Sequence, residues 1–282
     1  MAPRARLLLV LPASLLLTWC YKQAALPHRF ALDPPIPSSS SSPSPSLHTY
    51  SSAPACPPRQ REALLALSRA LRLARWDADD CCTWPGVGCD ERGLLRTLDL
   101  SRRRLEGTLP PDVRSLSSLR TLDVNGNEGL RGTLPSELGS LPELRALYAF
   151  GTRLSGTLPA SLLSLPSLRE LELSDARLSG TLPASIATAT SLRYLYLAGN
   201  RLSGTLPPSL ASLPALRELD AASNALSGTL PAALASRRLD HLGLEANPGL
   251  AGWVAPRVGR GCAGGEERHL RGQQRRGEAA PP

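Results

Sequence analysis

A row of leucines recurs about every 24 residues through most of the chain, since one copy begins at Leu192 and the next at Leu216. A unit of this length cannot bury its own leucines, so each copy must stack on neighbours that carry the same row. Aromatic residues make up only 4% of the chain, which fits a core built mainly of leucine. The pattern predicts a solenoid of about seven units, whose first leucines are Leu95, Leu119, Leu144, Leu168, Leu192, Leu216 and Leu239.

Each unit begins with an alternation of apolar and polar residues, such as LRYLYL at residues 192–197. This alternation predicts a short strand, and stacked copies would form one parallel sheet lining a concave face, with the leucines pointing inward. Further along the unit a glycine marks a turn and a proline precedes a helical turn. Proline suits the first helical position, because its missing N–H would have no partner there. The predicted fold class is therefore α/β, a solenoid of strands and short helical turns.

The segment ahead of the repeats predicts a cap. Apolar residues at spacings of three and four indicate an amphipathic helix over residues 61–77. A cysteine cluster surrounds that helix, at Cys56, Cys81, Cys82 and Cys89. Adjacent cysteines cannot easily bridge each other, so Cys81 and Cys82 should each pair elsewhere. Such a unit would cover the leucines that the first repeat exposes, as solenoids require at their ends.

The segment from Arg61 to Cys89 resembles the N-terminal cap of plant-type leucine-rich repeat proteins. The LxGxLP element of the units is similar to the plant-specific repeat subclass, found in receptor-kinase ectodomains and polygalacturonase inhibitors. This resemblance covers residues 56–261 and implies two disulfides, Cys56 with Cys81 and Cys82 with Cys89. It also implies a second short strand at the threonine that precedes each Leu-Pro pair, as at Thr205.

The same resemblance assigns a structural role to an asparagine after the strand, whose amide bonds neighbouring backbone groups in the turn. This asparagine is present at Asn127, Asn200, Asn224 and Asn247. Other residues stand at three equivalent positions, Arg103, Thr152 and Ala176. We expect those three turns to be less well held unless their backbone groups find other partners.

The chain ends indicate processing and location. Arg4 and Arg6 precede an apolar run at residues 7–19, followed by small residues, so residues 1–25 are predicted to be a signal peptide. That run is shorter than the roughly 20 residues that span a bilayer. Residues 26–58 form a predicted Pro/Ser-rich stalk, 59–94 the cap, 95–261 the repeats and 262–282 a disordered basic tail. We expect an extracellular protein of the cell wall or cell surface, with a signal-anchored or an organellar protein as alternatives; the partner of Cys262 stays open.

The residues offer no arrangement suited to catalysis. In the repeats His241 stands beside Asp240. Adjacent strand residues point to opposite faces, so the two are poor candidates for a catalytic base and the acid that orients it. The four histidines lack metal-ligand spacing. The formal charge of the chain is +8, but residues 95–261 contain 18 arginines against 14 acids and so carry only +4. No nucleic-acid-binding motif accompanies this charge. We expect no enzyme activity, no metal, no cofactor and no nucleic-acid partner.

The candidate binding residues are those that break the monotony of the repeats on the predicted concave face. Tyr148 and Tyr196 should lie roughly 10 Å apart on that face with Glu172 between them, because strands stack about 4.8 Å apart. Exposed aromatic side chains flanked by acids suit a peptide with basic and apolar side chains, although such tyrosines can also simply pack on their neighbours. The candidate set is Asp123, Tyr148, Phe150, Glu170, Glu172, Tyr194, Tyr196, Glu218 and Asp220.

A row of arginines occupies the second position of the units, at Arg96, Arg120, Arg145, Arg169, Arg193 and Arg217. We interpret this row mainly as a solvated edge that shares its charge with nearby acids, with an acidic polymer such as pectin as the other hypothesis.

The sequence therefore predicts a recognition module that binds a protein or peptide ligand, as the resemblance implies for defence or developmental signalling. A membrane receptor kinase or a secreted glycosidase could be the partner. Two alternatives stay open. One is an inhibitor of an extracellular polysaccharide-degrading enzyme, and the other is a structural component of the wall, attached through its stalk.

Overall fold

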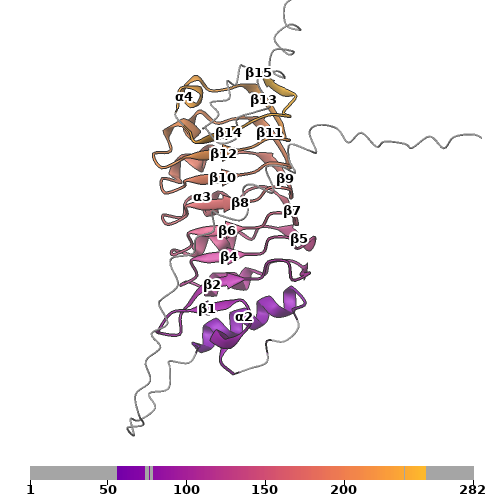
Figure 1. The fold of residues 1–282 in the computed structure, drawn as a ribbon, viewed down its shortest axis with the longest axis vertical. Helices are drawn as coiled ribbons and strands as arrows, with labels where there is room; N and C mark the ends of the chain where they lie inside the picture. Colours follow the sequence, from indigo (N-terminus) through magenta and orange to yellow (C-terminus); the bar gives the residue numbers. More distant parts are fainter. Residues whose placement is uncertain (1–55, 74–75, 77–78, 238, 252–282) are drawn as a thin grey trace, which may run out of the picture. The chain divides into compact units, whose positions relative to one another are not determined.

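The computed structural model describes residues 56–73, 76, 79–237 and 239–251, which form a capped stack of repeats (Figure 1). Two sheets run along the stack, one of eight strands and one of seven, and each repeat contributes one strand to each sheet. Seven parallel strands follow one another in the first sheet, one for each predicted unit. The prediction of a leucine-rich repeat solenoid with about seven repeats is confirmed.

The eight-stranded sheet is built from the leucine alternation. Within it β1 is antiparallel to β2, whereas β2 and the later strands are parallel, and equivalent residues face one another along the sheet. The leucines of these strands are buried, as at Leu147 and Leu195, so the core lies between the two sheets and the helical turns. The strands are β1 (Val87–Cys89), β2 (Leu95–Asp99), β4 (Thr121–Asp123), β6 (Ala146–Tyr148), β8 (Glu170–Glu172), β10 (Tyr194–Tyr196), β12 (Glu218–Asp220) and β14 (His241–Gly243).

The seven-stranded sheet is the second strand set that the resemblance implied. Its strands are β3 (Glu106–Gly107), β5 (Gly129–Thr133), β7 (Arg153–Gly156), β9 (Arg177–Thr181), β11 (Arg201–Thr205), β13 (Ala225–Thr229) and β15 (Gly249–Ala251). Gly180 has a φ of +79°, and a Cβ there would lie 2.8 Å from Cγ2 of Thr157 in the preceding repeat. The recurring glycine and threonine are thus one packing device, since each threonine methyl occupies space that only glycine leaves open.

Short helical turns follow the second strands, and neighbouring turns contact one another. They are η2 (Pro111–Ser115), η3 (Ser136–Ser140), α3 (Ala160–Leu163), η4 (Ala184–Thr188), η5 (Pro208–Ser212) and α4 (Ala232–Ala235). The proline of each Leu-Pro pair is the N-cap of its turn, with ψ between 125° and 155°, so it precedes the turn as predicted and lies one residue before the first helical position. Proline still fits there because it favours extended backbone and needs no donor.

The cap consists of α2 (Pro58–Ala70), the 3-10 turn η1 (Cys81–Thr83) and β1. Both implied disulfides are present, Cys56–Cys81 and Cys82–Cys89. Buried Gln60 joins the cap to the stack, because its amide donates to the Gly93 carbonyl and accepts from the Leu95 N–H at 2.8 Å. Trp76 and Trp84 stack with ring centroids 5.1 Å apart.

The cap helix differs from its prediction. It ends at Ala70 rather than at Asp77, and it begins three residues before Arg61, with proline at its first position. Arg72 takes a positive φ of 52°, which turns the chain out of the helix although the apolar spacing continues to Ala74. Local backbone geometry overrides the periodic pattern at that point.

The asparagine ladder has the predicted form. Asn200, which is buried, donates to the Leu173 and Leu197 carbonyls and accepts from the Leu178 N–H. Asn127, Asn224 and Asn247 repeat this arrangement. Backbone groups at two of the three gaps have other partners. Thr152 donates its hydroxyl to the Ala149 carbonyl, and the Arg103 N–H donates to Asn127.

Most of the predicted signal peptide, stalk and basic tail lies outside the described residues, as do Cys262 and the end of the predicted repeat segment. Among the helices that the structure describes, none combines the length and the apolar character needed to span a membrane.

Candidate ligand-binding surface on the eight-stranded sheet

Two columns of side chains run across the middle of the eight-stranded sheet. The centre column places Asp123, Tyr148, Glu172, Tyr196 and Asp220 opposite one another on β4 to β12. The adjacent column aligns Glu170, Tyr194 and Glu218 on β8, β10 and β12. The register thus brings together eight of the nine predicted site residues and places Glu172 between the two tyrosines, as expected. We call these eight residues the acid–tyrosine stripe.

Each centre tyrosine is held by an acid of the next strand. The Tyr148 hydroxyl donates to Glu170, and the Tyr196 hydroxyl donates to Glu218 at 2.6 Å. Burial raises the pKa of Tyr148, and the hydrogen bond to Glu170 raises this pKa further. Both rings are half-buried and fixed in place, so they combine the predicted exposure with packing on their neighbours.

Glu218 differs most from its expected role. Its side chain is only 3% exposed, so it is not a surface acid available to a ligand. It lies where the sequence predicted, but its carboxylate accepts the Tyr196 hydroxyl and thereby fixes that ring. Charged side chains are seldom fully buried without such a partner.

Each acid of the centre column makes the same kind of hydrogen bond to the backbone. The carboxylates of Asp123, Glu172 and Asp220 each accept the N–H two residues further on, at distances between 2.8 and 3.0 Å. This contact fixes one oxygen where the strand ends. Burial raises the pKa of Glu172 to about 7, and burial also raises those of Asp123 and Asp220. The charge of the stripe therefore changes near neutral pH.

The remaining aromatic residues extend this surface. Tyr194 and Tyr196 point to the same side of β10 and stack, with ring centroids 6.4 Å apart. Phe150 lies two residues beyond Tyr148 and is half-buried, and its N–H donates to the Asn125 side chain. The structure thus combines half-buried rings with oriented carboxylates on one face.

Five of the six arginines along this sheet fall into two groups, a paired one and an unpaired one. Glu143 accepts hydrogen bonds from Arg96 and Arg120, and Arg96 also pairs with Asp90 at 2.8 Å. These bonds hold the pKa of Glu143 below its usual value. Further along, Arg169, Arg193 and Arg217 are exposed and make no ion pair with any described residue. Charge sharing was correctly predicted only at the N-terminal end of the row.

The described residues contain no group of three or more histidine, cysteine, aspartate or glutamate side chains able to hold a metal ion. His241 and Asp240 are neighbours on the chain, His241 being the first residue of β14. The arginines of the seven-stranded sheet were not among the predicted site residues, although three of them recur visibly in RLSG segments, at Arg153, Arg177 and Arg201.

The geometry is that of a capped repeat solenoid with a parallel sheet along one face. Family models agree with it. A model for the leucine rich repeat N-terminal domain matches residues 57–90, and leucine rich repeat models match residues 94–116 and 166–226. The chain belongs to the plant-type leucine-rich repeat proteins.

Curated relatives match over limited segments. Receptor-like protein 36 of Arabidopsis thaliana is 40% identical over 80 residues, which are 25% of this chain and 11% of the relative. Polygalacturonase inhibitor 1 of Oryza sativa subsp. japonica is 33% identical over 82 residues, 27% of this chain and 25% of the relative. The chain spans only 8–11% of the first three relatives it matches.

Solved structures match over more of the chain. The Arabidopsis receptor kinase HAESA, in complex with the peptide hormone IDA and the co-receptor SERK1, is 33% identical with a TM-score of 0.63, covering 70% of this chain and 35% of that one. The BIR3–SERK2 complex from Arabidopsis thaliana is 31% identical with a TM-score of 0.51, covering 59% and 94%.

Proposed function

We propose that the protein is an extracellular, non-enzymatic recognition module that binds a peptide or a protein segment on the acid–tyrosine stripe. The observation that carries this proposal is the alternation of tyrosines and acids across β4 to β12 in one register. A ligand that lies across these strands would meet rings and carboxylates in turn. Cationic and apolar side chains suit that sequence of contacts.

The half-buried state of the rings supports binding. Aromatic side chains that are already fixed lose little conformational freedom when a ligand covers them. Glu170 and Glu218 fix the two tyrosines, while Glu172 presents a carboxylate between them. The likeness to HAESA, which was solved with a peptide hormone, supports the same class of ligand. Two disulfides in the cap support an oxidising, extracellular location.

A peptide library tests this proposal. The full chain is immobilised and used to select from random peptides, which should be enriched in sequences that combine Lys or Arg with apolar residues. The double variant Tyr148→Ala/Tyr196→Ala should lose binding of the selected peptides, whereas Ser179→Ala/Ser203→Ala on the other sheet should retain it. Equal binding by both variants, or no enrichment of cationic peptides, would contradict the proposal.

A second function is favoured by one specific match, the segment that is 33% identical to a polygalacturonase inhibitor. An inhibitor would use the same face to cover an enzyme rather than a peptide. The purified chain added to a polygalacturonase assay separates the two. Saturable inhibition that the Tyr148→Ala/Tyr196→Ala variant loses would support inhibition, and an unchanged rate at every concentration would reject it.

A further inference from the structure

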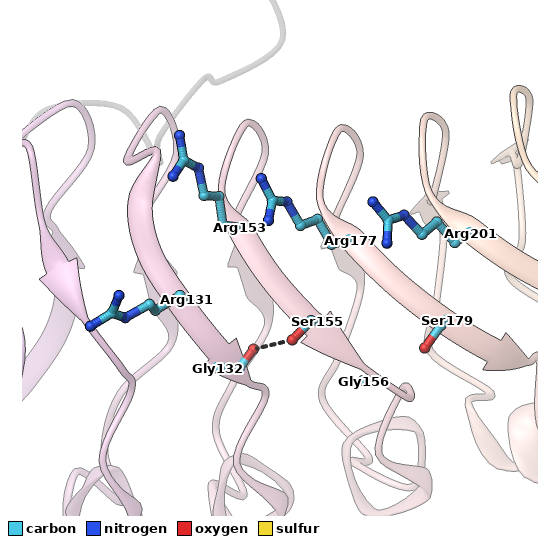
Figure 2. A pocket seen from close by; sticks show the side chains of 8 residues that line it. All are labelled: Arg131, Gly132, Arg153, Ser155, Gly156, Arg177, Ser179 and Arg201. Carbon is cyan, nitrogen blue, oxygen red and sulfur yellow. Dashed lines mark hydrogen bonds between the residues drawn. The ribbon is translucent and has the colours of Figure 1, made fainter.

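A second row of arginines lies on the seven-stranded sheet, away from the stripe. Arg131 on β5, Arg153 on β7, Arg177 on β9 and Arg201 on β11 follow one another along this sheet (Figure 2). We call these four residues the lateral arginine row. They border a surface depression of about 480 Å³, whose other lining residues are Gly132, Ser155, Gly156 and Ser179.

The guanidinium groups of this row have no protein partner among the described residues. All four side chains are exposed, and none makes a hydrogen bond or an ion pair. The strands β5, β7, β9, β11 and β13 contain no aspartate or glutamate. Four like charges on one face repel each other and add nothing to the stability of the fold. By contrast, Arg96 and Arg120 on the other sheet share Glu143.

The spacing within the row follows from the strand register. Arg131 faces Arg153 directly, whereas Ser155 faces Arg177 and Ser179 faces Arg201, so β9 and β11 are each shifted by two residues from the preceding strand. Strands lie about 4.8 Å apart and rise about 3.3 Å per residue, so the Cα atoms of Arg153, Arg177 and Arg201 follow one another at about 8 Å, while those of Arg131 and Arg153 lie about 4.8 Å apart. Figure 2 shows Arg153, Arg177 and Arg201 extending in the same direction, one from each strand. This is a line of cations rather than a cluster around one point.

We propose that the lateral arginine row binds a linear acidic polysaccharide laid across the strands. A line of guanidinium groups matches a polymer that carries recurring carboxylates or sulfates, because guanidinium binds such oxyanions through paired N–H donors. Serine hydroxyls between the arginines provide hydrogen-bonding groups for sugar hydroxyls.

Other polyanions fit the site less well. The lining contains only arginine, glycine and serine, so it offers neither an aromatic platform for unpaired bases nor an apolar anchor for an acidic peptide. The cap disulfides indicate an oxidising compartment, where nucleic acid is not the common polyanion. This site is separate from the stripe and does not depend on the peptide proposal.

The test measures binding of the full chain to polygalacturonate and to dextran sulfate by calorimetry, at low and at raised salt. Arg153→Gln/Arg177→Gln/Arg201→Gln should weaken the affinity on the order of tenfold or more. Raised salt should weaken polymer binding by the wild type more than binding by this variant, because the variant has fewer ionic contacts for salt to screen. The two polymers show whether carboxylate or sulfate is the preferred anion.

The matched control is Arg169→Gln/Arg193→Gln/Arg217→Gln, which removes the same charge from exposed positions beside the other sheet. It should retain most of the affinity, and both triple variants should unfold at the wild-type temperature. An equal loss in both variants would overturn the proposal, as would failure of the wild type to bind either polymer. Equal affinity for fully methyl-esterified polygalacturonate, for double-stranded DNA or for polyglutamate would also overturn it.

Discussion

Glu172 shows how one residue can link stability to pH. Its pKa is about 7 in the fold, above its ordinary value of 4.5, so the folded chain binds a proton that the unfolded chain releases between those values. The free energy of unfolding should therefore fall as pH rises from about 4.5 to about 7. Since the side chain is partly accessible, we expect this contribution to be on the order of 2 kcal/mol.

Substitution isolates that contribution. Glu172→Gln should be more stable than the wild type at pH 7.5 and should lose most of the fall in stability, as measured by urea unfolding at several pH values. In this variant the free energy of unfolding should still fall slightly as pH rises, because the pKa values of Asp123 and Asp220 are also raised. A variant whose slope equals that of the wild type would show that Glu172 is not the titrating group.

The hydroxyl of Tyr196 gives a second residue-scale prediction. Tyr196→Phe removes the donor to buried Glu218 and should cost about 1–3 kcal/mol in the free energy of unfolding. Tyr194→Phe is the matched control, because the structure gives the Tyr194 hydroxyl no hydrogen bond to any described residue. Urea unfolding of the two variants compares them directly, and equal stability would contradict the role assigned to Glu218.

At the scale of the structural element, glycine and threonine define the second sheet. Gly180→Ala should destabilise the chain by more than about 1 kcal/mol, because the new Cβ meets the Thr157 methyl and the backbone has positive φ. Gly151→Ala shares the positive φ, at +64°, but its Cβ would lie 3.8 Å from the nearest atoms. Thermal unfolding should therefore show the larger loss for Gly180→Ala, and the reverse order would exclude the packing argument.

The repeat elements were predictable because each is encoded several times. The leucine alternation, the asparagine and the Gly-Thr pair recur with the period of the fold. A strand that is hard to predict in one repeat is therefore indicated by the equivalent residues of the other repeats. The cap helix occurs once, and its end at Ala70 depends on the positive φ of Arg72, which no periodic pattern indicates. The position of the proline before each turn was predictable for the same reason, because the Leu-Pro pair recurs in each of the first six repeats.

The candidate site was predictable to the level of residue position. The strand period and the repeat length placed Tyr148, Glu172 and Tyr196 in one register. The burial of Glu218 and its bond to Tyr196 could not be obtained in that way, because they depend on which side chains of adjacent repeats meet. Such contacts differ between repeats that look alike in sequence.

At the scale of the whole molecule, the cap protects the first repeat, and its two disulfides should contribute unequally. Cys56–Cys81 joins residues 25 apart and Cys82–Cys89 residues 7 apart. Chain entropy predicts a loss of about 3.5 kcal/mol when the first pair is replaced by alanine and about 2.4 kcal/mol for the second. Denaturant unfolding of the two double variants tests that order, and a larger loss for the Cys82–Cys89 pair would contradict it.

Two faces of one stack serve different proposed ligands, a peptide on the eight-stranded sheet and an acidic polysaccharide on the seven-stranded sheet. Both proposals use residues that vary from repeat to repeat or remain unpaired, while the leucines, glycines and asparagines form the scaffold. This division is expected of a solenoid, in which each repeat contacts only its neighbours and its outward positions are free to change.

Hydrogen exchange of the full chain, with and without a cationic peptide selected on it, tests whether the acid–tyrosine stripe binds the ligand. With the peptide bound, exchange should slow in β6, β8 and β10 and in the residues that follow them, including Phe150, and should stay unchanged in β7, β9 and β11. Protection confined to the seven-stranded sheet or to the helical turns would contradict the assignment of the acid–tyrosine stripe as the ligand-binding surface.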